Sequence, residues 1–191
     1  MTLPKGGITK IYLSGKRTPH MGVTDQGVSS ERWAAIPRTL IFLTNGGDVL
    51  LMERGKHKRV FPGRYNGIGG HVERHEDPLT SARREITEET GLPTEAIRNL
   101  RLRGLYHIDA GGPTGVIVYI FTGEAAQRAG INNEEGTLHW VPIGGWDGLP
   151  LTDALPILLP RLLGPSPDTA LLSMHVHYDA ADKMVIRFGE P

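Results

Sequence analysis

Residues Gly70–Leu92 read GHVERHEDPLTSARREITEETGL, and this stretch decides how the rest of the chain is interpreted. It fits the pattern G-x5-E-x7-R-E-U-x-E-E-x-G-U without a miss, where U is Ile, Leu or Val. Even if Gly and Glu each made up about a tenth of residues, fewer than about one chain per million would match by chance. The fixed positions are Gly70, Glu76, Arg84, Glu85, Ile86, Glu88, Glu89, Gly91 and Leu92.

The same stretch predicts a helix with defined ends. Asp77 followed by Pro78 is typical of a helix start, with a side-chain acceptor at the N-cap and proline at the first helical position. Gly91 predicts the end, because glycine accepts the left-handed conformation that closes a helix. Apolar residues spaced three and four apart then form one stripe, which consists of Leu79, Ala82 and Ile86.

Three glutamates cluster on a neighbouring face of this helix. Glu85, Glu88 and Glu89 recur at positions i, i+3 and i+4, so their carboxylates repel each other unless a cation lies among them. Mg²⁺ and Mn²⁺ are the divalent ions that prefer such oxygen ligands. The alternative is a solvated acidic face with Arg84 nearby. The glycine-rich loop 66–70 favours the metal site, because glycines let the backbone approach a ligand closely.

The stretch resembles the Nudix box, and the looser similarity extends from about Arg38 to about Leu163. The resemblance implies an α+β Nudix fold, in which a mixed β-sheet is sandwiched between helices (α/β/α). It implies a Mg²⁺-dependent hydrolase, with Mn²⁺ as a substitute, acting on a nucleoside diphosphate linked to another group. The implied metal ligands are Glu85, Glu88, Glu89 and the carbonyl of Gly69, and one glutamate would serve as the base. Arg84 would orient a glutamate, Gly70 would contact substrate, and Glu76 would support the loop and helix.

The segment before the box is similar to MutT-type triphosphatases that clear oxidised purine nucleotides. Tyr65 stands where some of those proteins have tryptophan, and Asn66 matches their asparagine. The amide of Asn66 can donate to and accept from a purine edge, although it could instead support a turn. Asp153 is a second candidate for base recognition, with a helix N-cap as the alternative. The expected reaction converts a purine triphosphate, including an 8-oxo form, to a monophosphate and pyrophosphate.

Other interpretations stay open at this point. The substrate could be ADP-ribose or a dinucleoside polyphosphate, because Nudix enzymes share chemistry and differ in substrate. An inactive Nudix domain that senses nucleotides is the alternative of another class, yet all the box glutamates are present. Glu134 and Glu135 are either an extra carboxylate source for the metal or loop charges. Loop cations that could meet phosphate or solvent are Arg54, Lys56, Lys58, Arg59 and Arg64, and His71 has the same two possibilities.

Composition narrows the class of protein. The 191 residues contain 21 Lys plus Arg and 21 Asp plus Glu, so no net positive charge favours a nucleic-acid polymer as partner. The chain has no cysteine, which excludes disulfides, zinc thiolates and thiol catalysis. It has neither an apolar signal core nor an apolar run of membrane-spanning length. We therefore expect a cytoplasmic protein with a small-molecule nucleotide substrate and no membrane partner.

Two regions are expected along the chain. Residues 1–37 form an N-terminal extension of unknown role, in which Ile11-Tyr12-Leu13 could add a short strand. Residues 38–191 form the Nudix domain, which includes a C-terminal hairpin. Apolar patterns and turn signals predict strands over 38–44, 49–52, 100–108, 116–122, 138–141, 174–178 and 184–188, and a helix over 155–163.

Overall fold

An eight-stranded mixed β-sheet forms the centre of the computed structural model, which describes residues 26–29, 31–128 and 134–189. The chain divides into the units Met1–Arg32 and Trp33–Pro191, and all the elements below belong to the second unit. The expected strand at Ile11-Tyr12-Leu13 lies outside the described residues. The strands are β1 (Ala34–Asn45), β2 (Asp48–Arg54), β3 (Tyr65–Asn66), β4 (Ile97–Asp109), β5 (Thr114–Ala125), β6 (Gly136–Pro142), β7 (Leu172–Tyr178) and β8 (Met184–Phe188).

The strand order is β3-β2-β1-β5-β4-β7-β8, and β6 pairs with the other side of β2. The pairs β1–β5 and β4–β7 are parallel, while the other neighbours are antiparallel. Strands β1 and β2 are paired only next to their turn, at Thr44–Val49 and Asn45–Asp48. Away from this turn, the edge of β1 that faces β2 pairs with the glycine-rich loop 66–70 instead of with β2.

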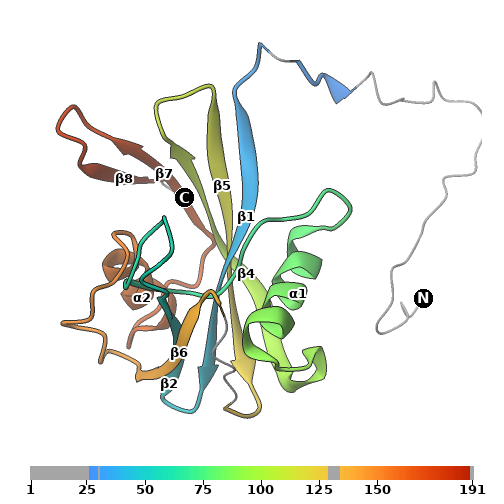
Figure 1. Ribbon diagram of the computed structural model, residues 1–191, viewed down its shortest axis with the longest axis vertical. Coiled ribbons are helices and arrows are strands. Elements are labelled where there is room, and N and C mark those ends of the chain that lie inside the picture. Colours follow the sequence, from blue (N-terminus) through green and yellow to red (C-terminus); the bar gives the residue numbers. More distant parts are fainter. Residues whose placement is uncertain (1–25, 30, 129–133, 190–191) are drawn as a thin grey trace, which may run out of the picture. The chain divides into compact units, whose positions relative to one another are not determined.

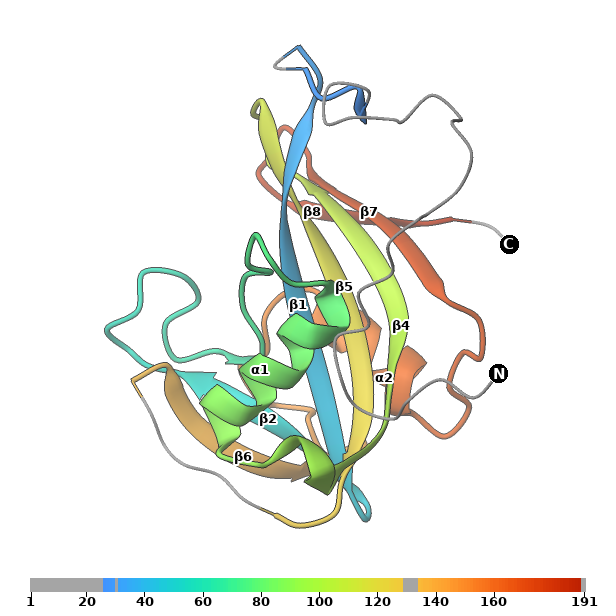
Figure 2. The same ribbon diagram turned by 90° about the vertical axis from the view of Figure 1, so that its right-hand side faces the viewer.

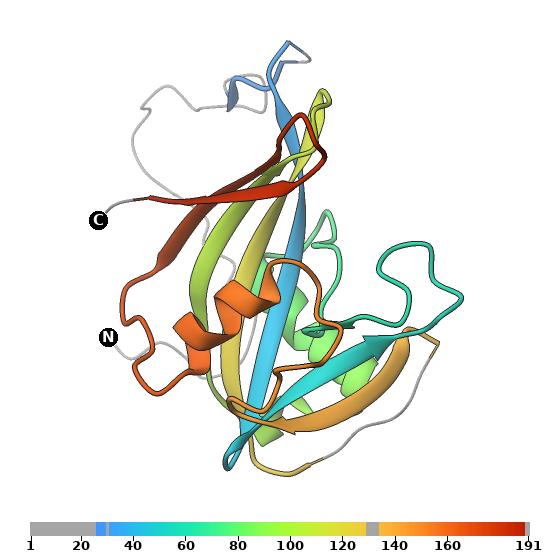
Figure 3. The same cartoon turned by 90° about the vertical axis from the view of Figure 1, so that its left-hand side faces the viewer.

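The sheet is covered by a helix on each face (Figure 1). Helix α1 (Pro78–Thr90) lies in front of β1 in Figure 2, and helix α2 (Leu155–Leu163) crosses the opposite face in Figure 3. The β1 residues 40–43 are all buried and alternate between the two cores. Phe42 packs in the core that contains Leu158 of α2, and Ile41 packs in the core that contains Ile86 of α1. The predicted α/β/α sandwich is confirmed.

Both ends of α1 follow from its sequence. The Asp77 side chain accepts hydrogen bonds from the backbone N–H groups of Leu79 (2.9 Å) and Thr80 (3.1 Å). Gly91 ends the helix with a φ of 71°, in the left-handed region. The predicted apolar stripe is buried at Ala82 and Ile86 but wrong at Leu79, which lies in the first turn and is 39% exposed.

The predicted helix Leu155–Leu163 and strand Met184–Phe188 are confirmed at both ends. Several strands are longer than predicted, because backbone pairing continues past the apolar run that reveals them. Strand β1 begins at Ala34 rather than Arg38, since it follows β5 from the Ala34–Thr114 pair onward. The two-residue β3 and the 3-10 turn Thr94–Ala96 were not predicted, because they are too short for any periodicity. In the described part of the chain, no helix is long and apolar enough to cross a membrane.

Candidate active site

The glycine-rich loop runs beside β1 and joins the sheet. Ile41 and Ile68 exchange both backbone hydrogen bonds, at 2.8 and 3.2 Å, and the N–H of Thr39 donates to the carbonyl of Gly70 at 2.8 Å. A Cβ atom on Gly67 would lie 2.8 Å from the Ile41 carbonyl oxygen. The loop is therefore held by backbone contacts that leave no room for a side chain at this position.

Gly69 breaks this pairing and turns toward α1. Its φ is 129°, a conformation open to glycine, and an added Cβ would lie 2.5 Å from the Thr39 carbonyl oxygen. Its N–H donates to Oε2 of Glu89 at 2.8 Å instead of pairing with β1. The loop and the acidic helix are thus joined at the residue whose carbonyl is the predicted metal ligand.

The glutamates of α1 have unequal environments. Glu85 and Glu89 are each only 8% exposed, whereas the Glu88 side chain is 57% exposed. The Glu85 carboxylate lies against Gly70, because a Cβ added there would lie 2.5 Å from Glu85 Oε1. The sequence predicted one acidic face, but it did not predict that two of its members are buried between the helix and the loop.

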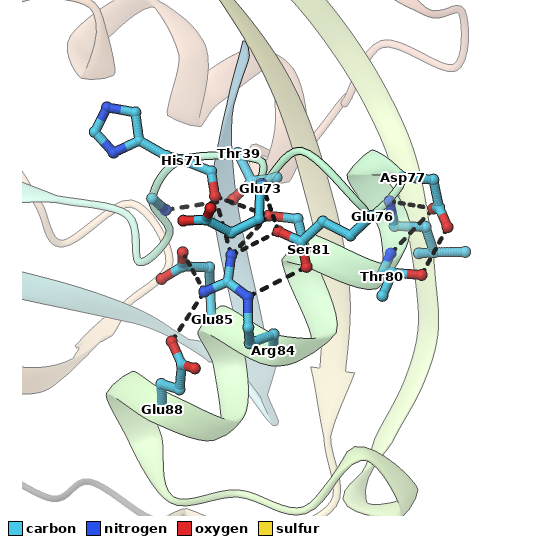
Figure 4. Close-up of polar contacts among 12 residues, drawn as sticks. Thr39, His71, Glu73, Glu76, Asp77, Thr80, Ser81, Arg84, Glu85 and Glu88 are labelled. Carbon is cyan, nitrogen blue, oxygen red and sulfur yellow. Dashed lines mark hydrogen bonds and ion pairs between the residues drawn. The ribbon is translucent and has the colours of Figure 1, made fainter. Parts of the chain in front are cut away.

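Arg84 connects the acidic side chains to the loop (Figure 4). Its guanidinium binds Glu76 through two nitrogens, with Nε at 3.2 Å from Oε2 and Nη2 at 2.7 Å from Oε1. Its Nη1 donates to Glu85 at 2.8 Å and to Glu88 at 2.9 Å, while Nη2 also donates to the His71 carbonyl at 3.0 Å. Arg84 therefore contacts two predicted metal ligands, but its bidentate partner is Glu76.

Glu76 and His71 have structural contacts in this network. Glu76 Oε1 accepts the N–H of Glu73 at 2.8 Å in addition to Arg84, so it fixes the loop that enters α1. Figure 4 shows the ring of His71 pointing away from Arg84 and the glutamates. The contribution of His71 to the cluster is its backbone carbonyl, a contact that residue type does not reveal.

Burial raises the pKa of both inner glutamates. Desolvation is the main cause for Glu85, and the ion pair with Arg84 opposes it. Desolvation raises the pKa of Glu89 to about 7, with the Gly69 N–H opposing the increase and the charges of Glu85 and Glu135 adding to it. Hydrogen bonds to Glu76, followed by those to Glu85, raise the pKa of Arg84 further above its already high value. The site therefore buries negative charge at a cost that a bound cation would offset.

The donor set fits a hard divalent cation. It offers carboxylate oxygens and a glycine carbonyl, which are the ligands of Mg²⁺ and Mn²⁺ in proteins. In the described residues, no group of three or more acidic or histidine side chains is placed to hold one ion. Arg84 donates to Glu85, and the Gly69 N–H donates to Glu89.

The two candidates for base recognition, Asn66 and Asp153, lie on segments that contact each other. Tyr65 pairs with Leu151, and the Thr152 hydroxyl donates to Oδ1 of Asn66 at 3.2 Å. Asp153 forms an ion pair with Arg64. Its alternative role is wrong: the N-cap of α2 is Ala154, one position after Asp153, and the helix has no side-chain cap.

The structure also shows polar contacts near the site that the sequence did not predict or for which it left two roles possible. Lys58 Nζ contacts Glu135 Oε1 at 2.6 Å, and Arg54 lies 3.6 Å from the same carboxylate. Glu135 is thereby held near Glu89, whose pKa it raises, whereas Glu134 is exposed. Tyr65 lies 3.4 Å from Glu53 and its ring is 5.3 Å from that of His139. Strand pairing of β2 with β3 and β6 creates this last group, and no local pattern could have revealed it.

The α/β/α sandwich and the packing of the glycine-rich loop against the acidic helix are the features expected of a Nudix protein, and comparison with protein families gives the same assignment. The sequence model of the NUDIX domain matches residues 35–154. The chain therefore belongs to the Nudix family and is a Nudix hydrolase.

Individual proteins that resemble this chain are known from sequence and from structure. The chain is 31% identical over 122 residues to the oxidized purine nucleoside triphosphate hydrolase of Mus musculus, covering 62% of this chain and 71% of that protein. It is 32% identical over 107 residues to the protein of the same name from Danio rerio, covering 55% and 65%. Its structure resembles the MutT protein of Bacillus halodurans, with a TM-score of 0.63 and 24% identity over 82% of this chain and 99% of that one.

Proposed function

We propose that this protein is a Mg²⁺-dependent diphosphatase that converts purine nucleoside triphosphates, including 8-oxo forms, to monophosphates and pyrophosphate. The observation that carries the proposal is the burial of Glu85 and Glu89 against Gly69–Gly70. Buried carboxylates with raised pKa values, next to a close-packed glycine backbone, are arranged for a cation and a phosphate chain rather than for stability.

The roles follow from the positions of the side chains. Glu85, Glu88 and Glu89, with the Gly69 carbonyl, would hold the ion, and Mn²⁺ could replace Mg²⁺. When bound, the ion would neutralise phosphate charge and activate water. Arg84 positions Glu85 and Glu88, and one of the glutamates takes the proton from the attacking water. The Gly70 backbone, against which the Glu85 carboxylate packs, would contact the substrate beside this carboxylate.

The purine preference is supported by the relatives and by the pair Asn66 and Asp153. These residues lie on segments that are joined through Thr152, and their side chains supply amide and carboxylate groups. Such groups match the donors and acceptors on a purine edge. Both mammalian and fish relatives are oxidized purine nucleoside triphosphate hydrolases by name.

A substrate screen tests this proposal. Purine and pyrimidine triphosphates, 8-oxo-dGTP, ADP-ribose and dinucleoside polyphosphates are compared with Mg²⁺, and the products are separated by chromatography. We expect the highest kcat/KM for a purine triphosphate, with monophosphate and pyrophosphate as products. A higher value for ADP-ribose would contradict the substrate class, and absence of turnover on every compound would favour a nucleotide-sensing domain.

Asn66→Ala tests base recognition separately. A bidentate base contact contributes ~1–3 kcal/mol of discrimination, so the purine preference in kcat/KM should shrink by roughly five-fold to a hundred-fold. Asn45→Ala is the matched control, because the Asn45 amide donates to the Ala125 carbonyl at 2.8 Å, in the β1–β2 hairpin. Equal losses for purines and pyrimidines in Asn66→Ala would assign Asn66 to structure alone.

A further inference from the structure

Three histidines and one aspartate form a two-by-two array on β4 and β7. His107 is the register partner of His175, and Asp109 is the register partner of His177. On β7, Leu172, Met174 and Val176 are buried, so the two histidines lie on the opposite face. Parallel pairing places all four side chains on one face of two adjacent strands, about 5 Å apart between strands.

This array is separate from the acidic site. Strand β7 follows residue 154, where the match to the NUDIX domain ends, whereas the glutamates belong to α1. Leu172 and Met174 pack in the core under α2, so the array faces the other side of the sheet. Figure 2 shows α1 lying over β1 on that side rather than over β4 and β7.

The surroundings of the array are suited to nitrogen ligation. The rings of His175 and His177 stack with centres 5.5 Å apart. Nδ1 of His177 is buried and has no hydrogen-bond partner among the described residues. This ring nitrogen has therefore lost its contact with water without gaining a hydrogen bond, and it is available as a metal ligand. A surface cleft of about 330 Å³ contains both rings together with Asp109 and Arg187. Among the residues that the structure describes, the Arg187 guanidinium is the one cationic group that lines this cleft, and the Asp109 carboxylate in the same cleft carries the opposite charge.

We propose that His107, Asp109, His175 and His177 form a second metal site, for a borderline divalent ion such as Zn²⁺, Ni²⁺ or Cu²⁺. Imidazole prefers these ions, whereas the oxygen ligands of α1 prefer Mg²⁺. The donors do not yet converge: the His107 ring is 6.1 Å from that of Trp33, and Asp109 accepts the Gly111 N–H at 2.8 Å. Rotation of these side chains closes the site, because the strand register already fixes their backbone spacing.

The bound ion would connect the C-terminal hairpin to the central sheet. Strand β7 is the only link between β8 and the rest of the sheet in the described strand order. An ion held from both β4 and β7 reinforces this junction, and binding to the folded state raises its thermal stability. The site therefore predicts a stabilising effect of Zn²⁺ or Ni²⁺ that does not depend on hydrolysis.

Calorimetric titration of Zn²⁺ and Ni²⁺ into the full chain without a polyhistidine tag tests the proposal. Millimolar Mg²⁺ is present throughout to occupy the carboxylate site. We expect one ion per chain and a higher Tm. His175→Ala/His177→Ala should bind at least about 100-fold more weakly, because losing ligands costs more than the 10–100-fold loss caused by removing their outer-shell partners.

Two further variants make the result decisive. His57→Ala/His75→Ala removes the same number of histidines elsewhere and should bind like the unmodified chain. Asp109→Asn together with His107→Ala removes the β4 half and should weaken binding even if the β7 variant folds poorly. Hydrolysis with Mg²⁺ should be unchanged in the β4 variant. Unaltered Zn²⁺ affinity in both array variants, or its loss in the control, would overturn the proposal.

Discussion

Glu89 shows how single residues combine structure and chemistry in this protein. It accepts a hydrogen bond from Gly69 and is buried, so its carboxylate holds the loop while its charge is poorly solvated. The sequence predicted Glu89 as a ligand because the box pattern fixes its position. Its burial was not predictable, because that depends on the loop packing over the helix, a contact between segments that periodicity does not describe.

The stability of the metal-free protein should depend on Glu89 ionisation. Its folded pKa is about 7 against 4.5 for an ordinary glutamate, so the folded state binds more protons between these values. Stability should therefore fall as pH rises from about 4.5 to about 7, and then level off. Glu89→Gln keeps the shape of the side chain without its charge. At pH 8 in EDTA, its free energy of unfolding should exceed that of the unmodified chain by on the order of 1–3 kcal/mol.

Urea unfolding of both proteins at pH 5 and pH 8 measures this difference. The gap between Glu89→Gln and the unmodified chain should be larger at pH 8 than at pH 5. A gap that is equal at both pH values, or a variant less stable at pH 8, would show that burial of this charge is not costly.

Glu88 and Glu89 should both be essential for turnover. Glu88→Gln and Glu89→Gln should each lower kcat by at least ~10²-fold, the scale of losing an acid–base or metal-activating group. Steady-state assays with Mg²⁺ give the rates, and circular dichroism checks the fold. Glu95→Gln is the matched control, because Glu95 lies in the 3-10 turn after the box. Normal turnover in Glu88→Gln would remove this exposed carboxylate from the site.

At the scale of elements, the loop 66–70 requires glycine at a particular place. Gly69→Ala would combine a φ of 129° with a Cβ 2.5 Å from the Thr39 carbonyl, so the loop must shift away from β1 and Glu89. We expect kcat/KM to fall by at least about tenfold, since small misplacements of catalytic groups are costly. Gly46→Ala also falls at a positive φ, of 62°, but has nothing within 4 Å of the added atom, so it should only lower stability.

Assays of both alanine variants at equal folded concentration separate the two effects. If Gly46→Ala reduces kcat/KM as much as Gly69→Ala, then backbone strain alone explains the loss and the loop geometry does not.

The limits of prediction at this scale have a physical origin. Helix α1 was predictable because Asp77 and Gly91 carry local capping signals. The attachment of the glycine loop to β1 was not, because it depends on β1 and β2 separating after Val49. The ion pair of Arg64 with Asp153 joins residues 89 positions apart, so residue type left several partners open for each.

For the whole molecule, two cores share one sheet, and only the α1 core carries the acidic site. Leu158 of α2 is fully buried in the other core. Leu158→Ala should destabilise the fold by about 2–5 kcal/mol through a cavity, while kcat of the folded fraction stays within about twofold. Thermal unfolding and turnover at low temperature measure the two quantities. A large loss of kcat in protein that remains folded would show that the two faces are coupled.

The sandwich itself was predictable from the order of apolar strands, the two helices and the Nudix box. Strand order was not, because the parallel pairs β1–β5 and β4–β7 join segments far apart in the chain. The array formed by His107 and His175 depends on the second of these pairs. Each histidine is unremarkable alone, and only the parallel register places them together.

Metal dependence is the central claim, and one measurement tests it most directly. The purified chain is treated with EDTA, transferred to metal-free buffer and assayed with 8-oxo-dGTP and dGTP while nucleotide and phosphate products are resolved. We predict no turnover without metal, and recovery on adding Mg²⁺ or Mn²⁺ with monophosphate and pyrophosphate as the products. Full turnover in metal-free buffer would contradict the account.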